Sequence, residues 1–176
     1  MLQRAYTRII DTIVEHRKLL GLPGSPTGRL VGIWARIMVL PQFILAPFTL
    51  LFGVFEGPMI FVARFLAMHI VHDLDKHMPY TRALGLCHLA TFGPLFVYFS
   101  LNFNSIHDAW GMFGILFAIE YAIIGLCLYL DARDMVLHMM GQPYPCYVRD
   151  HQRLGNLKLD DSRANEPVTL FSRLFW

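Results

Sequence analysis

The sequence predicts an all-α, polytopic membrane protein organised around a central antiparallel transmembrane hairpin. Hydrophobic residues make up 55% of the 176 residues, charged residues only 16%, and the mean hydropathy of +0.44 exceeds that of ordinary soluble domains. Two apolar segments, 84–103 and 109–130, each have the length of about 20 residues that a helix needs to cross a bilayer. The polar link 104–108 is so short that the two helices must be antiparallel neighbours.

The N-terminal segment 1–20 is predicted to form an amphipathic helix. Apolar residues recur there at spacings of three and four, and charged residues occupy the other side. Asp11 and Glu15 count against a mitochondrial presequence. We therefore expect this helix to lie on the membrane surface or on a partner, with 21–28 as a linker rich in glycine and proline.

A second apolar hairpin is predicted over about 37–71, bent at Pro41 and Pro47 and turning at 56–58. Its second half, 59–71, is short for a crossing and contains Arg64, so an interfacial helix is the alternative. Basic residues precede residue 37 and follow residue 130, but none lies in 104–108. The positive-inside rule then places both termini on the matrix or cytoplasmic side and predicts four membrane helices.

Beyond the hairpin, 131–140 is expected to prolong the last helix until Gly141 and Pro143 stop it. The chain thus divides into a surface helix and linker (1–28), a membrane domain (29–140) and an extended polar tail (141–176). The tail is too polar to fold alone, and it closes with the aromatic anchor 168–176. We expect neighbouring subunits to hold it.

Glu120 is the most informative residue, because a carboxyl near the middle of a membrane helix costs about 2.5 kcal/mol or more if it faces lipid. Thr91 lies level with it on the first helix of the hairpin, and His88 lies one turn deeper. We expect Glu120 to form a hydrogen bond with Thr91 or His88 as a structural clamp; a proton relay with His88 is the alternative. Another helix is expected to pack on the small residues of the same helix, which are Gly111, Gly114, Ala118, Ala122 and Gly125.

The segment 69–77 is the one place in the sequence with metal-ligand chemistry, through His69, His72 and His77. We interpret it mainly as a solvated or interfacial connector, because di-iron membrane enzymes need several such clusters and a b-type haem needs histidines on two facing helices. The cysteines have neither disulfide nor metal-ligand spacing. No cofactor is therefore expected, whereas bound lipid is.

The sequence contains no catalytic or nucleotide-binding motif and no internal repeat, and its net charge of +2 gives no reason to expect nucleic acid. The first expectation is a non-catalytic structural or accessory subunit of a large membrane complex. The setting favoured is ATP synthase or the respiratory chain in the mitochondrial inner membrane. The alternatives are a bacterial inner-membrane component of a secretion or conjugation machine, and a small transporter or redox protein using Glu120, His88 and 69–77.

Overall fold

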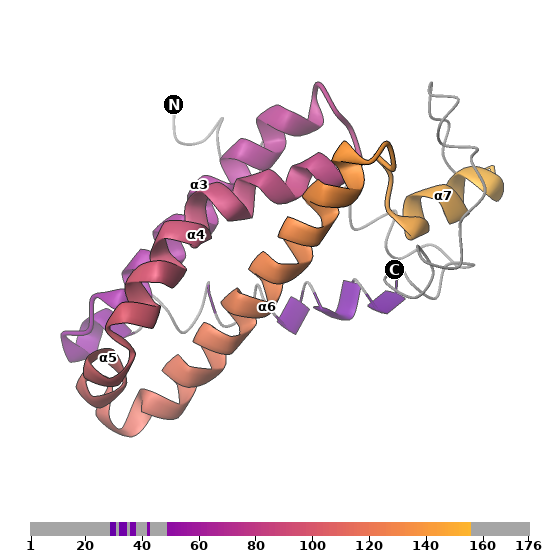
Figure 1. Ribbon diagram of the computed structural model, residues 1–176. Coiled ribbons are helices and arrows are strands. Elements are labelled where there is room, and N and C mark those ends of the chain that lie inside the picture. The colour runs from indigo at the N-terminus through magenta and orange to yellow at the C-terminus, as the bar shows by residue number, and fades with distance from the viewer. Residues whose placement is uncertain (1–28, 31, 35, 38–41, 43–48, 156–176) are drawn as a thin grey trace. The chain divides into compact units, whose positions relative to one another are not determined.

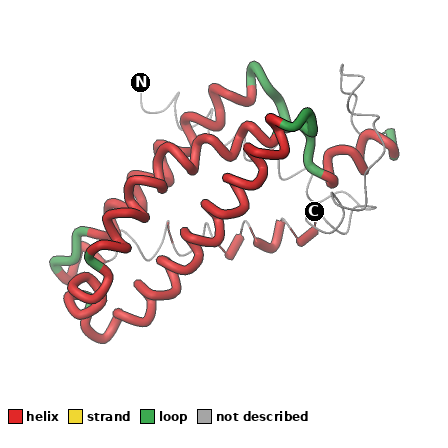
Figure 2. The backbone as a smooth tube through the Cα atoms, in the orientation of Figure 1, coloured by secondary structure: helices red, strands yellow, loops and turns green. Residues whose placement is uncertain are grey.

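The computed structural model describes residues 29–30, 32–34, 36–37, 42 and 49–155, and this part of the chain is helical with no strand (Figures 1 and 2). The predicted all-α class is therefore confirmed. The elements in order are η1 (Thr49–Phe52), α3 (Glu56–Asp75), η2 (Arg82–Gly85), α4 (Leu86–Leu101), α5 (Phe103–Ala109), η3 (Gly111–Phe113), α6 (Gly114–Met139) and α7 (Cys146–Arg153).

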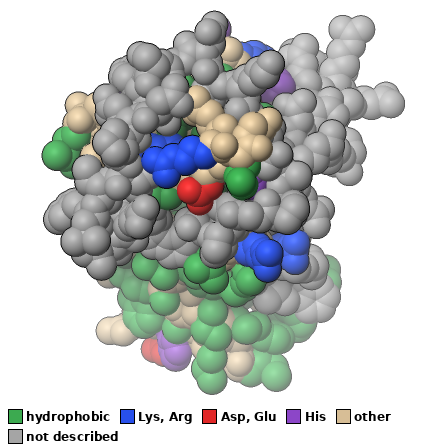
Figure 3. Space-filling model, turned by 90° about the vertical axis from the view of Figure 1, so that its right-hand side faces the viewer, with side chains coloured by type: hydrophobic (Ala, Val, Ile, Leu, Met, Phe, Trp, Pro, Cys, Tyr) green, Lys and Arg blue, Asp and Glu red, His purple; other side chains and the backbone are tan. Residues whose placement is uncertain are grey.

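Three segments within this part are long and apolar enough to cross a membrane: Glu56–Asp75, Arg82–Leu101 and Gly111–Met139. At most a third of the residues in each apolar stretch is buried inside the chain. Figure 3 shows hydrophobic side chains gathered over the lower part of the face in view. These observations are consistent with an integral, multi-pass membrane protein.

Helix α3 differs from the prediction at both of its ends. It begins at Glu56, so Pro58 lies in its first turn, where a missing N–H costs no helical hydrogen bond. It continues for 20 residues to Asp75, so the idea of a short segment ending at 71 is wrong. The predicted connector at 69–77 is also wrong for 69–75, because Ile70, Val71 and Leu74 continue the apolar pattern of the helix.

The link between the two hairpin segments is also helical, contrary to the predicted polar loop. Helix α4 ends at Leu101 because Asn102 leaves the helical conformation, at φ −118°, and its side-chain amide donates to the carbonyl of Tyr98 at 2.9 Å. Helix α5 follows, with Ile106 buried. Gly111 then adopts φ +51°, a conformation that favours glycine, and α6 starts at Gly114.

The end of α6 agrees with the predicted extension. The helix runs to Met139 and the chain leaves it at Gly141, which has φ +83°. The N–H of Gln142 donates to the carbonyl of Leu137 at 2.9 Å, and that of Gly141 donates to the carbonyl of His138 at 3.0 Å. This pair of bonds is the Schellman motif, which satisfies the last carbonyls of a helix.

The chain divides into two compact units. One comprises Arg36–Ile70 and Gly85–Arg133, and the other includes Val71–Leu84 and the residues from Asp134 onward. The expected amphipathic helix at 1–20, the linker, the bends at Pro41 and Pro47, and the tail beyond 155 lie outside the residues that the structure describes.

In the second unit, buried Arg82 joins the turn after α3 to the end of α6. Its guanidinium forms an ion pair with Asp134, and its N–H donates to the carbonyl of Pro143 at 2.7 Å. Burial raises the pKa of the nearby Tyr147 phenol to about 12, and the carboxylate of Asp134 acts in the same direction. The turn after α3 and the end of α6 are therefore in contact within this unit.

Candidate functional site

A line of four polar side chains runs through the first unit, from Gln42 to Asp131. Arg64 of α3 is 5% exposed; its Nε donates to Oε1 of Gln42 at 2.7 Å and its Nη1 to Nε2 of His88 at 2.8 Å. On its other side, His88 of α4 contacts Oδ2 of Asp131 on α6 through Nδ1, at 2.9 Å. We call this set the Arg64 network. It connects all three described apolar helices.

The donor inventory of these groups fixes their protonation and orientation. Because a guanidinium only donates, Nε2 of His88 must accept, and the ring proton must be on Nδ1, from which it is donated to Asp131. His88 is then a neutral imidazole. The same reasoning applied to Gln42, whose Oε1 accepts from Arg64, leaves its NH₂ group for another partner.

The surroundings of the network are apolar and closely packed. The guanidinium of Arg64 lies 5.1 Å from the centroid of the buried Phe92 ring, in cation–π geometry. A Cβ at Gly85 would meet Oδ1 of Asp131 at 3.0 Å, so the start of α4 lies very close to this carboxylate. The side chains of His88 and Asp131 are 20% and 19% exposed. The network thus leads from a buried cation to a partly exposed carboxylate.

Glu120 lies next to the network without belonging to it. The residue is 5% exposed, and neither carboxyl oxygen has a hydrogen-bond partner in the part of the chain that is described. Its polar neighbours are the amide of Gln42 and the charge of Arg64. The side chain of Gln42 lies near the carboxyl group of Glu120, but no hydrogen bond of normal geometry joins the two side chains.

The predicted hydrogen bond from Glu120 to Thr91 or His88 is therefore wrong. The Thr91 hydroxyl donates to the carbonyl of Cys87 in its own helix, at 2.8 Å. Both ring nitrogens of His88 are engaged by Arg64 and Asp131. The sequence does contain a signal for the bonds that join Arg64, His88 and Asp131. Arg64 is a cation in an apolar run and therefore needs an anionic or polar partner. The sequence pattern, however, places Asp131 in the part of the helix beyond the membrane.

The small residues of the last helix do not form one common surface. A Cβ at Gly125 would meet Cε2 of Phe96 on α4 at 3.0 Å, and one at Gly114 would meet Nε2 of His107 at 2.9 Å. These two glycines therefore allow close packing inside the chain. A Cβ at Gly111 would meet nothing within 4 Å, and Ala122 is exposed whereas Ala118 is half-buried. Packing of a separate helix on Ala118 and Ala122 stays a prediction.

The three histidines considered as metal ligands lie around the end of α3. His69 and His72 belong to the helix and His77 to the turn that follows it. The ring of His69 meets that of Phe65 edge-on, at 4.7 Å between centroids. Within the described ranges, no three or more His, Cys, Asp or Glu side chains are grouped so that they could hold a metal ion.

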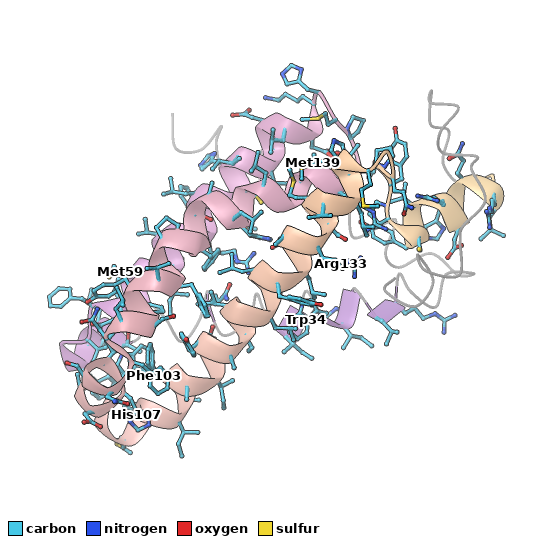
Figure 4. All side chains as sticks on the ribbon, in the orientation of Figure 1. Trp34, Met59, Phe103, His107, Arg133 and Met139 are labelled. Atoms are coloured by element: carbon cyan, nitrogen blue, oxygen red, sulfur yellow. The ribbon has the colours of Figure 1, made fainter. Side chains whose placement is uncertain are left out.

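An aromatic cluster fills the other end of the same unit. The buried ring of Phe117 on α6 lies 5.4 Å from each of three rings, Phe99 of α4, Phe103 of α5 and Trp110. Phe96 stacks on Tyr121 at 4.8 Å. Phe103 and His107 can be followed at the turn between α4 and α6 in Figure 4. We call these rings the aromatic cluster; its contacts pair α4 and α6 in opposite chain directions.

Comparison of the chain with protein-family models, curated proteins and solved structures finds no match. A role for the protein is therefore inferred from its own residues and their geometry.

Proposed function

We propose that the protein is a non-catalytic structural subunit of a multi-subunit membrane complex. The observation that carries this proposal is the Arg64 network, in which Arg64, His88 and Asp131 bond to one another across three helices. Polar groups used in this way fix which helices meet and in which register. A substrate site would instead offer such groups to a ligand.

The outward faces of the helices support a role in assembly. Large apolar side chains are exposed on every described span, among them Leu66 on α3, Val97 on α4 and Ile119 on α6. In a bilayer, these faces contact lipid chains or the helices of neighbouring proteins. We propose that other membrane subunits cover part of this surface and that bound lipid covers the rest.

We also propose a placement of the chain in the membrane. The ring of Phe52, just before α3, lies 5.2 Å from that of Phe113, just before α6, so these two turns share one end. The turn that follows α3 carries Lys76 and Arg82. By the positive-inside rule we place Lys76 and Arg82 on the matrix or cytoplasmic side. A further crossing within 37–55 would complete a second hairpin and return both termini to that side.

As the setting we propose an energy-transducing complex of the mitochondrial inner membrane, either ATP synthase or a respiratory complex. Small, polytopic, motif-free chains are common in such assemblies. A secretion or conjugation machine in a bacterial inner membrane is the alternative, with the same requirements on this chain. A transporter is the second alternative, and the observation that favours it is the carboxyl of Glu120, which has no hydrogen-bond partner among the described residues.

Site-specific photocrosslinking in intact membranes tests the structural role. A benzophenone side chain is placed at Leu66, Val97 or Ile119 in turn, and at the buried Phe99, which is 0% exposed, as the matched internal control. We expect at least one exposed position to give a single discrete adduct with another membrane protein that co-purifies in fixed stoichiometry. Adducts with lipid alone from all three positions, together with a native mass of one chain or a homo-oligomer, would contradict the proposal.

A further inference from the structure

The structural role gives no use to the buried carboxyl of Glu120. The side chain of Glu120 is buried, with 5% of the residue exposed. Both of its carboxyl oxygens lack a hydrogen-bond partner among the described residues. A clamp would satisfy these oxygens, as Asp131 is satisfied by His88. An ionised carboxylate in this position would be costly, because no described cation bonds to it to replace its hydration.

The cation nearest to Glu120 is already committed elsewhere. Arg64 directs its Nε to Gln42 and its Nη1 to His88, and no ion pair joins it to Glu120. To reach Glu120, the guanidinium would have to leave His88, which would then lack the donor to Nε2. The Gln42 amide can offer its NH₂ group to the carboxyl, but an amide carries no compensating charge.

The charges of the groups that face Glu120 also disfavour its ionised form. Arg64 on α3 contributes one positive charge and Asp131 on α6 one negative charge, while His88 on α4 is neutral by its bonding pattern. The thiols of Cys87 on α4 and Cys127 on α6 also lie near Arg64. With these thiols protonated, an ionised Glu120 would leave a net charge of −1 between the helices. A protonated Glu120 makes the set neutral.

We propose that Glu120 is a proton-binding site, at which the carboxyl group holds one exchangeable proton at neutral pH in the membrane. The bond that forms on uptake is the O–H bond of the carboxylic acid, and the proton comes from water. Release returns it to water and leaves a carboxylate, which Arg64 can neutralise if it exchanges His88 for Glu120. This site is additional to the structural role and does not depend on which complex the chain joins.

Infrared spectroscopy of the full chain in lipid bilayers tests the site. A variant carrying Glu15→Gln, Glu56→Gln and Glu166→Gln retains Glu120 as its single glutamate, and growth with glutamate labelled by ¹³C at the side-chain carboxyl carbon identifies its band. Adding Glu120→Gln gives the matched blank. We expect a labelled carboxylic-acid C=O band at pH 7 that is replaced by a carboxylate band when the pH is raised.

Two results would overturn the proposal. One is a labelled carboxylate band alone at pH 7, which would mean that the carboxyl is ionised and neutralised by other means. The other is loss of the acid band at constant pH when sodium replaces potassium, which would make this a cation site. Because the label reports on Glu120 in a chain that retains it, the test does not require Glu120→Gln to fold. Failure of the crosslinking test above would leave this result unaffected.

Discussion

The Arg64 network and the aromatic cluster both join α4 to α6, but by different means, and only the network also includes α3. In the aromatic cluster, Phe117 meets three rings at one distance, 5.4 Å, with interplanar angles from 39° to 79°. In the network, each contact requires one donor and one acceptor within 3 Å. Ring packing tolerates many arrangements of similar volume, whereas each bond of the network requires a matched donor and acceptor. The aromatic cluster therefore stabilises the packing of the helices, and the network specifies how they are aligned along their axes.

The largest expected effect comes from emptying the aromatic cluster. Phe117→Ala removes a ring that is 0% exposed and leaves a cavity, so we expect a loss of about 3 kcal/mol in the free energy of unfolding. Phe117→Leu should recover more than half of that loss, because it restores most of the volume. Reversible unfolding in bicelles measures both values. Equal losses for the two variants would contradict the idea that volume dominates here.

A smaller effect is expected from the network, with a different pattern of rescue. Arg64→Met preserves apolar bulk but removes the donor to His88 and the counter-charge to Asp131, so we expect a loss of about 1 to 2 kcal/mol. Adding Asp131→Asn should recover part of it, because the uncompensated charge is then gone. The same bicelle measurement applies. Strictly additive losses in the double variant would show that Arg64 and Asp131 do not act as a unit.

The same comparison explains which features of the fold and of the site can be predicted from the sequence. Apolar length and the short link predicted the helical class and the segments around α4 and α6, because burial in lipid depends on composition and length. The extension of α6 to Gly141 was readable because helix stop signals are local. The hydrogen-bond partners of the buried polar residues could not be predicted from such local signals. Arg64, His88 and Asp131 lie 24 and 43 residues apart along the chain, and only the packed helices bring them together.

The ends of the predicted elements failed for a related reason. The polar residues of 69–77 and 104–108 predict loops, yet 69–75 and 104–108 are helical throughout. Polar residues at the end of a membrane helix need not end it, because the backbone hydrogen bonds continue beyond the apolar core. The sequence correctly predicts that Glu120 faces protein, but the predicted hydrogen bonds to Thr91 and His88 are wrong. The reason is that Thr91 bonds within its own helix and His88 bonds to Arg64 and Asp131.

The most direct test of the central claim, that a single polar network fixes three membrane helices, is the tautomer of His88. Solid-state ¹⁵N NMR of the chain in bilayers, with labelled histidine and assignment by His88→Gln, reports which ring nitrogen carries the proton. The network predicts a neutral ring protonated at Nδ1, with Nε2 free to accept from Arg64. A ring protonated at Nε2, or at both nitrogens at neutral pH, would contradict it, because His88 could then not accept from Arg64.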